Sequence, residues 1–292
     1  LRTGLQIWFS GRDIVFDYGL VRPAGVVLKT KGGRASGPDP LKELLTFTRN
    51  IIMARQGKHL TSLDCHDIAC YCGAIVQVGG VRRAAMLSLS DLDDTGIAAC
   101  KNGEFWIQNA HRSMSNNSAV FEEKPSATEF MEEWLNLAKS GTGERGIFNR
   151  AAVIPERRLR SDFGTNPCGE IQLKSREMCN LSIAVAKPLD NQISLEKKVK
   201  LAAIFGTLQA TLTHFPYLRQ DWKDNCVEER LLGVDITGQM DCPLLASNPN
   251  RNYLLACMKE IAIKTNQDFA DRFGINRSAA TTCIKPAGNS SQ

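Results

Sequence analysis

The spacing of hydrophobic and polar residues predicts helices separated by short strands. Apolar positions recur at helical spacing in five stretches, residues 40–56, 62–78, 126–140, 193–219 and 250–273. Pro40 and a Ser62 cap mark two of the helix starts, and Ser126 followed by Glu129 has the pattern of a capping box. Short apolar runs bounded by turn residues predict strands within residues 79–94, 143–150, 231–243 and 279–292. Strands that alternate with helices favour a largely parallel α/β domain.

Composition narrows the class of protein. The chain has 292 residues with 43% hydrophobic and 23% charged side chains, which is typical of a globular protein large enough to bury a core. Its net charge of +5 suits an anionic ligand such as a nucleotide, while the low aromatic content of 7% argues against a base-stacking surface for nucleic acid. No apolar run reaches the ~20 residues of a membrane helix, and no signal peptide is visible, so we expect a cytoplasmic protein without membrane contact.

The two ends of the sequence look internal. The chain starts at Leu1 without a methionine and stops just after a glycine-rich turn, where another element should follow. We therefore expect residues 1–292 to be the central portion of a single catalytic domain, with further parts on both sides. Residues 18–42 are rich in glycine, proline and basic residues and predict loops around short extended pieces.

Ten cysteines without a secretory signal indicate thiols in a reducing compartment. Cys65, His66, Cys70 and Cys72 include the residue types that bind zinc, but on a helix they point to two different faces, so we predict buried thiols and no metal site. The other cysteines without ligand spacing are predicted to be structural, and they are Cys100, Cys226, Cys242, Cys257 and Cys283. His111 and His214 have no motif around them.

One stretch combines an amide, a thiol and a carboxylate at alternating positions. Asn166, Cys168 and Glu170 would project the same way from an extended chain, so the amide could bind a ligand hydroxyl and the carboxylate could accept its proton. On spacing alone, the simpler explanation is favoured, in which Cys168 is a small buried residue and Glu170 an exposed one. Cys179, eleven positions later, changes this balance because a second thiol can supply electrons through thiol–disulfide chemistry.

Several ordered motifs resemble one enzyme family. The segment TNPCGEIQLKSREMCNLSIAVAKP is similar to the central stretch of the large subunit of ribonucleotide reductases, with the cysteine spacing of the adenosylcobalamin-dependent class II enzymes. Five further segments resemble the monomeric, triphosphate-reducing branch or the wider family in the same order, and they are VRPAGVVLKTKGGRASGP, CHDIACYCGAIVQVGGVRRAAMLSLSDLDD, GERGIFNR, LLGVDITGQMD and TTCIKPAGNSSQ. The resemblance covers nearly the whole chain.

The resemblance implies a fold and an activity. The fold would be the ten-stranded α/β barrel of the ribonucleotide reductase and glycyl radical enzyme type, incomplete at both ends. The activity would be reduction of ribonucleoside triphosphates to 2′-deoxyribonucleoside triphosphates for DNA synthesis, with adenosylcobalamin as cofactor, a deoxynucleotide effector and a thioredoxin-type reductant. Two alternatives remain open: a ribonucleoside-diphosphate reductase of another class, and a non-catalytic nucleotide-binding regulatory fragment.

The resemblance also implies roles for individual residues. Cys168 matches the cysteine that becomes a thiyl radical and removes the 3′ hydrogen of the substrate. Glu170 matches the general base on the 3′ hydroxyl, and Asn166 matches the amide that holds the ribose hydroxyls. Cys179 matches one of the two redox-active cysteines, whose partner in this family lies before the present Leu1.

Two kinds of loop are expected to bind nucleotides. The turn at 286–292 has exposed backbone N–H groups that suit phosphate, and the family match assigns substrate phosphate to Ala287, Gly288, Asn289, Ser290 and Ser291. We expect this turn to open on the cavity that holds Cys168. Two effector loops are implied, with Lys29, Gly32, Gly33 and Arg34 in the first and Gly79, Gly80, Val81, Arg82 and Arg83 in the second. Solvated basic turns would explain the same residues more simply.

Overall fold

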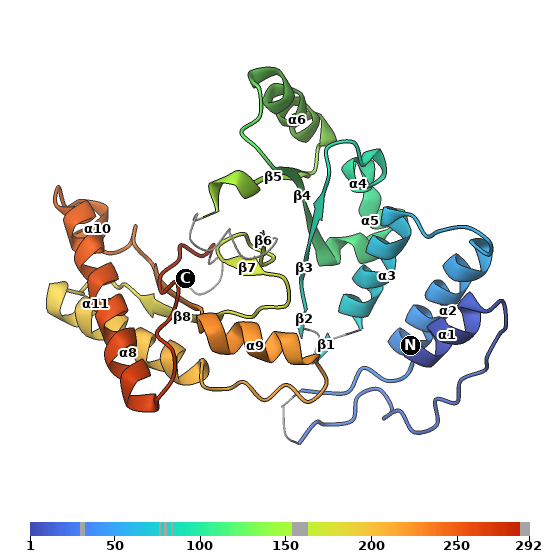
Figure 1. The fold of residues 1–292 in the computed structure, drawn as a ribbon, viewed down its shortest axis with the longest axis horizontal. Coiled ribbons are helices and arrows are strands. Elements are labelled where there is room, and N and C mark those ends of the chain that lie inside the picture. Colours follow the sequence, from blue (N-terminus) through green and yellow to red (C-terminus); the bar gives the residue numbers. More distant parts are fainter. Residues whose placement is uncertain (30–32, 76, 79–80, 83, 154–162, 287–292) are drawn as a thin grey trace. The chain divides into compact units, whose positions relative to one another are not determined.

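The computed structural model describes residues 1–29, 33–75, 77–78, 81–82, 84–153 and 163–286 (Figure 1). The chain divides into two compact units, Leu1–Ala152 and Val153–Gln292. Among the described residues, no helix combines the length and the apolar character needed to cross a membrane.

The first unit begins with three helices. They are α1 (Arg2–Phe9), α2 (Asp39–Ala54) and α3 (Ser62–Ala74). Trp8 of α1 packs against Leu45 and Ile52 of α2, and all three side chains are almost fully buried. The predictions of α2 and α3 are confirmed, but the cap of α3 is Thr61 and not Ser62. Thr61 accepts a hydrogen bond from the backbone of Asp64, whose side chain accepts one in return, so α3 begins with a capping box.

The rest of this unit is organised around a parallel sheet. Its strands lie in the order β3 (Met86–Ser90), β4 (Ser115–Phe121) and β5 (Gly146–Asn149), and both pairs are parallel. The strands β3 and β5 were predicted, whereas β4 was not. The prediction of α6 (Ala127–Ser140) with its Ser126 cap is confirmed. The shorter elements of the unit are β1 (Gln77–Val78), β2 (Val81–Arg82), α4 (Thr95–Ala99), α5 (Phe105–Gln108) and the 3-10 helices η1 (Ala110–Met114) and η2 (Arg150–Ala152).

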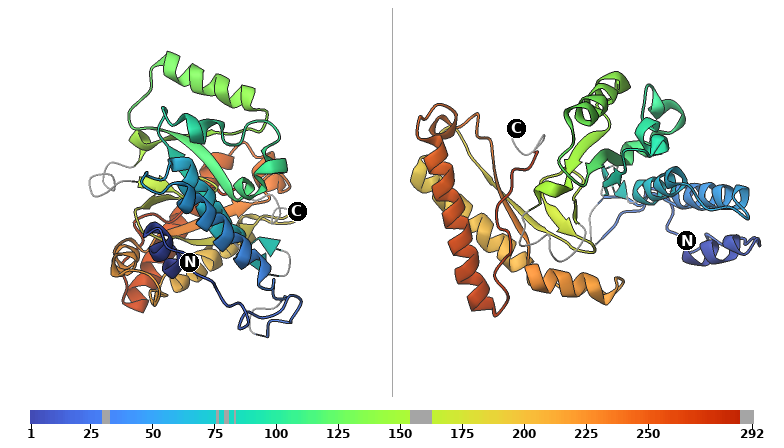
Figure 2. Two further views of the ribbon diagram at one scale, coloured as in Figure 1. Left: turned by 90° about the vertical axis from the view of Figure 1, so that its right-hand side faces the viewer. Right: turned by 45° about the horizontal axis from the view of Figure 1, so that its top comes forward.

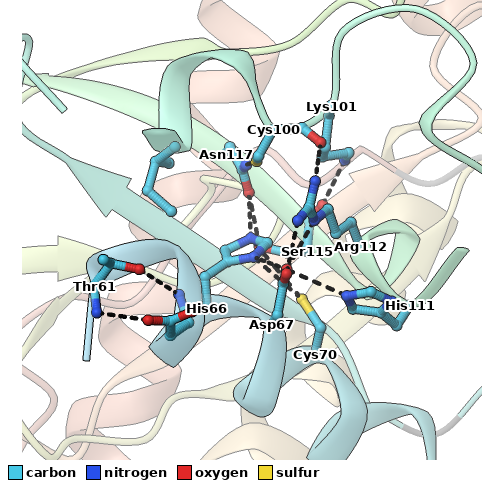
Figure 3. Close-up of polar contacts among 12 residues, drawn as sticks. Thr61, His66, Asp67, Cys70, Cys100, Lys101, His111, Arg112, Ser115 and Asn117 are labelled. Carbon is cyan, nitrogen blue, oxygen red and sulfur yellow. Dashed lines mark hydrogen bonds and ion pairs between the residues drawn. The ribbon is translucent and has the colours of Figure 1, made fainter. Parts of the chain in front are cut away.

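A buried polar network joins α3, η1 and β4 (Figure 3). Arg112 donates two hydrogen bonds to Asp67, of 2.8 and 2.7 Å, and His111 Nε2 lies 3.2 Å from the same carboxylate. His66 contacts Asp67 through one ring nitrogen and Asn117 Oδ1 through the other, each at 3.2 Å. His111, which has no motif in the sequence, therefore belongs to this network. The contacts satisfy charges that would otherwise be costly to bury.

We expect Asp67→Ala to lower the free energy of unfolding by about 3–5 kcal/mol, because it leaves the largely buried side chain of Arg112, only 12% exposed, without its counter-ion. Urea unfolding would measure the change. Lys42→Ala is the control, since it removes an exposed ion pair with Asp39 and should cost about 1 kcal/mol or less. Equal losses in the two variants would contradict the prediction.

The same network gives a pH dependence of stability. Burial alone would raise the pKa of Asp67, but its hydrogen bonds from Arg112, His111 and His66 hold that pKa far below the ordinary range. Since the pKa is lowered on folding, the stabilisation is complete above pH about 4 and is lost only as the pH falls toward the folded value.

The second unit is built on a parallel strand pair and the helices that follow its strands. The pair consists of β8 (Asn180–Val185) and β9 (Leu232–Thr237), joined through α8 (Gln192–Gln209) and α9 (Gln220–Glu229). The long helix α11 (Arg251–Phe273) follows α10 (Pro243–Ala246) and packs against α8, as Figures 1 and 2 show. Buried aliphatic side chains from β8, β9, α8 and α11 form the core, among them Ala184, Leu195, Val199, Val234 and Met258.

The prediction of a strand at 279–292 is only partly confirmed. The described part runs beside β9 and makes one parallel bridge, between Thr282 and Val234. Backbone hydrogen bonds from Val234 to Thr281 and from Cys283 to Val234, of 2.9 and 3.1 Å, extend the contact. This segment is therefore aligned with the strand pair without forming a regular strand of its own.

The mixed α/β class is confirmed, but the predicted ten-stranded barrel is not formed by the described residues. Their strands form one three-stranded sheet and three two-stranded ones, and these sheets do not close on themselves. The remaining pair is the antiparallel hairpin of β6 (Phe163–Thr165) and β7 (Gln172–Lys174).

Candidate active site

Cys168 lies at the tip of the β6–β7 hairpin, where its side chain is exposed. The backbone N–H of Gly169 donates to the carbonyl of Asn166 at 2.9 Å, which closes a tight turn with Pro167 in its second position. Proline favours this position because its φ is fixed, and Gly169 supplies the left-handed φ of 82° that follows. Asn166 Oδ1 accepts a hydrogen bond from the backbone of Ile171 at 3.0 Å. The expected extended stretch is therefore a hairpin turn, whose base is fixed by Asn166.

Glu170 follows the tip and points into the protein. Its side chain is 0% exposed, and Oε1 accepts a hydrogen bond from Lys285 Nζ. The other oxygen, Oε2, is buried and has no hydrogen-bond partner among the described residues. Burial alone would raise the pKa of Glu170, but hydrogen bonds from Lys285 and Asn166 outweigh it and lower the pKa. The result is an ionised carboxylate with one oxygen left to accept a proton.

A cavity lies beside this carboxylate. Its volume is about 260 Å³, and it is lined by Glu170, Gln172, Leu232, Thr282 and neighbouring residues of the hairpin, β9 and the 280–286 segment. Ligand pockets for whole drug-sized molecules usually exceed roughly 300 Å³, so the hollow is suited to a sugar-sized group. Glu170 thus lines a cavity of this size, while its carboxylate lies just beneath the cavity surface.

Two thiols lie within electrostatic reach of Glu170. Cys179 directly precedes β8 and is half-buried, and both burial and the charge of Glu170 raise its pKa. Cys283 was predicted to be structural, but it lies on the segment beside β9. Burial, Asp235 and Glu170 raise the pKa of Cys283 to about 12, and Cys179 contributes as well. Both thiols are therefore held in their protonated form.

Lys285 and Asp235 were missed by the sequence analysis. The backbone N–H of Lys285 donates to Asp235 Oδ1 at 3.3 Å, while Asp235 Oδ2 is buried without a partner among the described residues. Burial raises the pKa of Asp235, and the nearby charge of Glu170 adds to this. The only signal in the sequence is a single charged residue inside each apolar run, in LLGVDIT and in TTCIKP.

The predicted phosphate residues, Ala287, Gly288, Asn289, Ser290 and Ser291, lie outside the described residues. The position of Pro286 is described, and its neighbour Lys285 contacts Glu170. The chain therefore enters the predicted phosphate turn directly after the residue that contacts Glu170.

The segment predicted as the first effector loop has the backbone hydrogen bonds of a short hairpin in the first unit. Its backbone pairs Leu28 with Gly33 and Val26 with Ala35, at 2.9 and 2.8 Å, and Gly33 has a left-handed φ of 78°. Arg34 donates to the carbonyl of Gly25 at 2.9 Å, so its guanidinium holds the loop itself. Lys29 is exposed, and Gly32 lies outside the described residues.

The segment predicted as the second effector loop is described only in part. Val81 and Arg82 form β2, which pairs antiparallel with β1. Gly79, Gly80 and Arg83 lie outside the described residues. Of the four candidate zinc ligands, His66 and Cys70 are buried in contact with each other, whereas Cys65 is exposed, so the prediction of buried thiols is wrong for Cys65. No cluster of potential metal ligands is found among the described residues.

Comparison with known proteins identifies the family. The chain is 34% identical over 241 residues to the adenosylcobalamin-dependent ribonucleoside-triphosphate reductase of Lacticaseibacillus paracasei, covering 78% of this chain and 31% of that protein. Its fold matches the crystal structure of a B12-dependent (class II) ribonucleotide reductase with a TM-score of 0.71 and 25% identity, over 91% of this chain and 40% of that one. The chain belongs to the ribonucleotide reductase family.

Other reductases extend the match along the chain. The enzyme of the same name from Lactobacillus acidophilus is 28% identical over 318 residues, which cover 94% of this chain and 41% of that protein. The class Id reductase alpha subunit of Actinobacillus ureae shares the fold, with a TM-score of 0.56 and 15% identity over 86% of this chain and 57% of that one. No protein-family model matches the chain. The chain thus spans about a third to two-fifths of the length of the curated reductases cited here.

Proposed function

We propose that the chain forms the central part of the catalytic domain of an adenosylcobalamin-dependent ribonucleoside-triphosphate reductase. The observation that carries the proposal is the hairpin with Cys168 exposed at its tip and the buried, ionised Glu170 beside it. A thiol and a carboxylate in this arrangement suit the removal of a hydrogen atom from a carbon and of a proton from the hydroxyl that this carbon bears. The similarity to reductases of that name supports the choice of substrate and cofactor.

Each residue has its own role in the proposed reaction. Cys168 as a thiyl radical removes the 3′ hydrogen atom of the ribose, and Glu170 Oε2 accepts the proton of the 3′ hydroxyl. Asn166, at the base of the turn, holds the ribose hydroxyls. The 2′ hydroxyl then leaves as water after it receives a proton from a thiol.

Cys179 and a second cysteine outside this chain complete the reaction. Together the two thiols give two electrons and two protons, and a disulfide forms between them. The raised pKa of Cys179 supports this role, because the thiol must still carry its proton when the hydroxyl leaves. Cys168 finally returns the hydrogen atom to the 3′ carbon and is a thiyl radical again, so the net change is the replacement of the 2′ hydroxyl by hydrogen, with the oxygen leaving as water.

The chain also has to fit its proposed cofactor. Adenosylcobalamin, when bound, would supply the radical that removes the hydrogen atom of Cys168. The exposed tip of the hairpin suits this, because the thiol can be reached by a group that is not part of the hairpin. We assign no cobalamin contacts to individual residues.

The same proposal includes the complete barrel fold and the binding of substrate phosphate, effector and reductant. The parallel alignment of β8, β9 and the 280–283 segment is what a ten-stranded barrel requires of three adjacent strands. The turn at 286–292 would bind the substrate phosphates. The loops containing Lys29, Gly33 and Arg34 and residues 79–83 would bind a deoxynucleotide effector, and a thioredoxin-type protein in the cytoplasm would reduce the disulfide.

The proposal is tested by Cys179→Ser in the complete reductase chain that contains these residues. The unaltered protein should form many deoxynucleotides per chain from a ribonucleoside triphosphate, adenosylcobalamin and a thioredoxin system. The variant should form at most one per chain, because serine cannot enter a disulfide, while cobalt–carbon bond cleavage should remain measurable. Cys257→Ser, a half-buried cysteine of α11 in the same unit, is the control and should turn over normally. Normal turnover by Cys179→Ser would remove this residue from the mechanism.

A further inference from the structure

Lys285 contacts the proposed base from a distant part of the sequence. Its ammonium group donates a hydrogen bond to Glu170 Oε1 across a separation of 115 residues. The Glu170 side chain is 0% exposed, and that of Lys285 is 23% exposed. A carboxylate buried to this extent would usually take up a proton and become neutral unless a positive charge lay beside it.

The position of Lys285 is fixed by the strand next to it. Its backbone N–H donates to Asp235 Oδ1, and the preceding Cys283 donates to the carbonyl of Val234 at 3.1 Å. The main chain that leads to the lysine side chain is therefore anchored to β9 at two points. The ammonium group reaches Glu170 from an ordered backbone, which limits the directions in which the carboxylate can turn.

The other groups near Glu170 do not replace this charge. Asp235, Cys179 and Cys283 lie within electrostatic range, from β9, the start of β8 and the 280–286 segment, and each would be negative if ionised. Asn166 is a neutral hydrogen-bonding partner. Lys285 is thus the cation that the described contacts assign to Glu170.

We propose that Lys285 is a positioning residue that keeps Glu170 ionised and fixes its orientation, so that Oε2 remains available to accept the 3′ hydroxyl proton. This inference rests on the proposed function of Glu170. It also links substrate binding to proton removal, because Lys285 lies two residues before Ala287, the first residue of the proposed phosphate site. Lys285 does not itself touch the reacting atoms.

The direct test is a titration of the Glu170 carboxylate in the 292-residue chain. Carbon NMR of glutamate-labelled protein would follow it, with Glu170→Gln to assign the signal. Lys285→Met should move the midpoint upward by about one pH unit or more, because burial then acts without its counter-ion. Lys285→Arg should restore a low midpoint. An unchanged midpoint in the Met variant would overturn the inference.

The second test is the pH profile of kcat/KM in the complete reductase. The acid limb reports the base in the free enzyme, so Lys285→Met should move this limb to higher pH by as much as the titration midpoint and, for a shift of about one unit, lower the rate about 10-fold at pH values well below both midpoints. A purely structural role would lower the yield or stability of the protein and leave the limb in place. If the Met variant does not fold, Lys285→Gln takes its place, since it keeps a hydrogen-bond donor but has no charge.

The two tests separate this inference from the proposed function. If the carboxylate titration shifts but no deoxynucleotide forms with any variant, the reductase assignment fails and the ion pair stands. If the reductase is active and neither the titration nor the acid limb shifts, the role of Lys285 is wrong and that of Glu170 stands.

Discussion

Replacing Cys168 by serine is expected to abolish deoxynucleotide formation in the complete reductase and to leave the fold unchanged. The bond between oxygen and hydrogen in serine is too strong for the side chain to shuttle a hydrogen atom to and from a sugar carbon. The exposed site at the hairpin tip tolerates the replacement, because the thiol is not packed in the core. The measurement is the yield of deoxynucleotide per chain, together with circular dichroism and nucleotide binding.

The matched control for this variant is Cys65→Ser. Cys65 is also exposed, but it lies on α3 in the first unit, and the proposed reaction does not use it. The control should keep full activity. Substantial turnover by Cys168→Ser would show that another group forms the radical and would make the assignment of the hairpin wrong.

Glu170→Gln is expected to lower kcat by about 10²–10⁴-fold, which is the usual contribution of a general base. Glutamine has nearly the same shape and can still accept the hydrogen bond from Lys285, so the loss reports proton transfer and not packing. The acid limb of the pH profile should also disappear, because glutamine does not titrate. Steady-state kinetics between pH 5 and 9 would measure both effects.

Glu260→Gln provides the control for the loss of one carboxylate. Glu260 is exposed on α11, so its replacement should change kcat by less than about twofold. A Glu170→Gln variant with the activity of this control would exclude Glu170 as the base.

The helices were predictable because their signals are local. Ser126 and Glu129 mark the start of α6 within four residues, and the apolar spacing of α11 can be recognised from the residues of that helix alone. The strand β4 gave no such signal, because Ser115 and Asn117 are polar and nevertheless buried. Their burial depends on hydrogen bonds to partners such as His66 and Lys101, which the sequence places far away.

In the candidate site, too, the local features were predictable from the sequence and the long-range contacts were not. Asn166, Cys168 and Glu170 share one turn and could be recognised as a motif. The contact of Glu170 with Lys285, and that of Lys285 with Asp235, join segments 115 and 50 residues apart. Spacing along the chain contains no information about such pairs, since they depend on how β9 is placed beside the hairpin and the 280–286 segment.

The distance in sequence between Glu170 and Lys285 has a consequence for synthesis. The hairpin can form as soon as it leaves the ribosome, because its contacts are local, but its counter-ion follows 115 residues later. At about 5–20 residues per second, this delay is roughly 6–23 s. During that time the Glu170 carboxylate must stay in water or carry a proton. The nascent chain therefore displays its thiol before it has a working base, and the site becomes competent for acid–base chemistry only when the last described segment docks on β9.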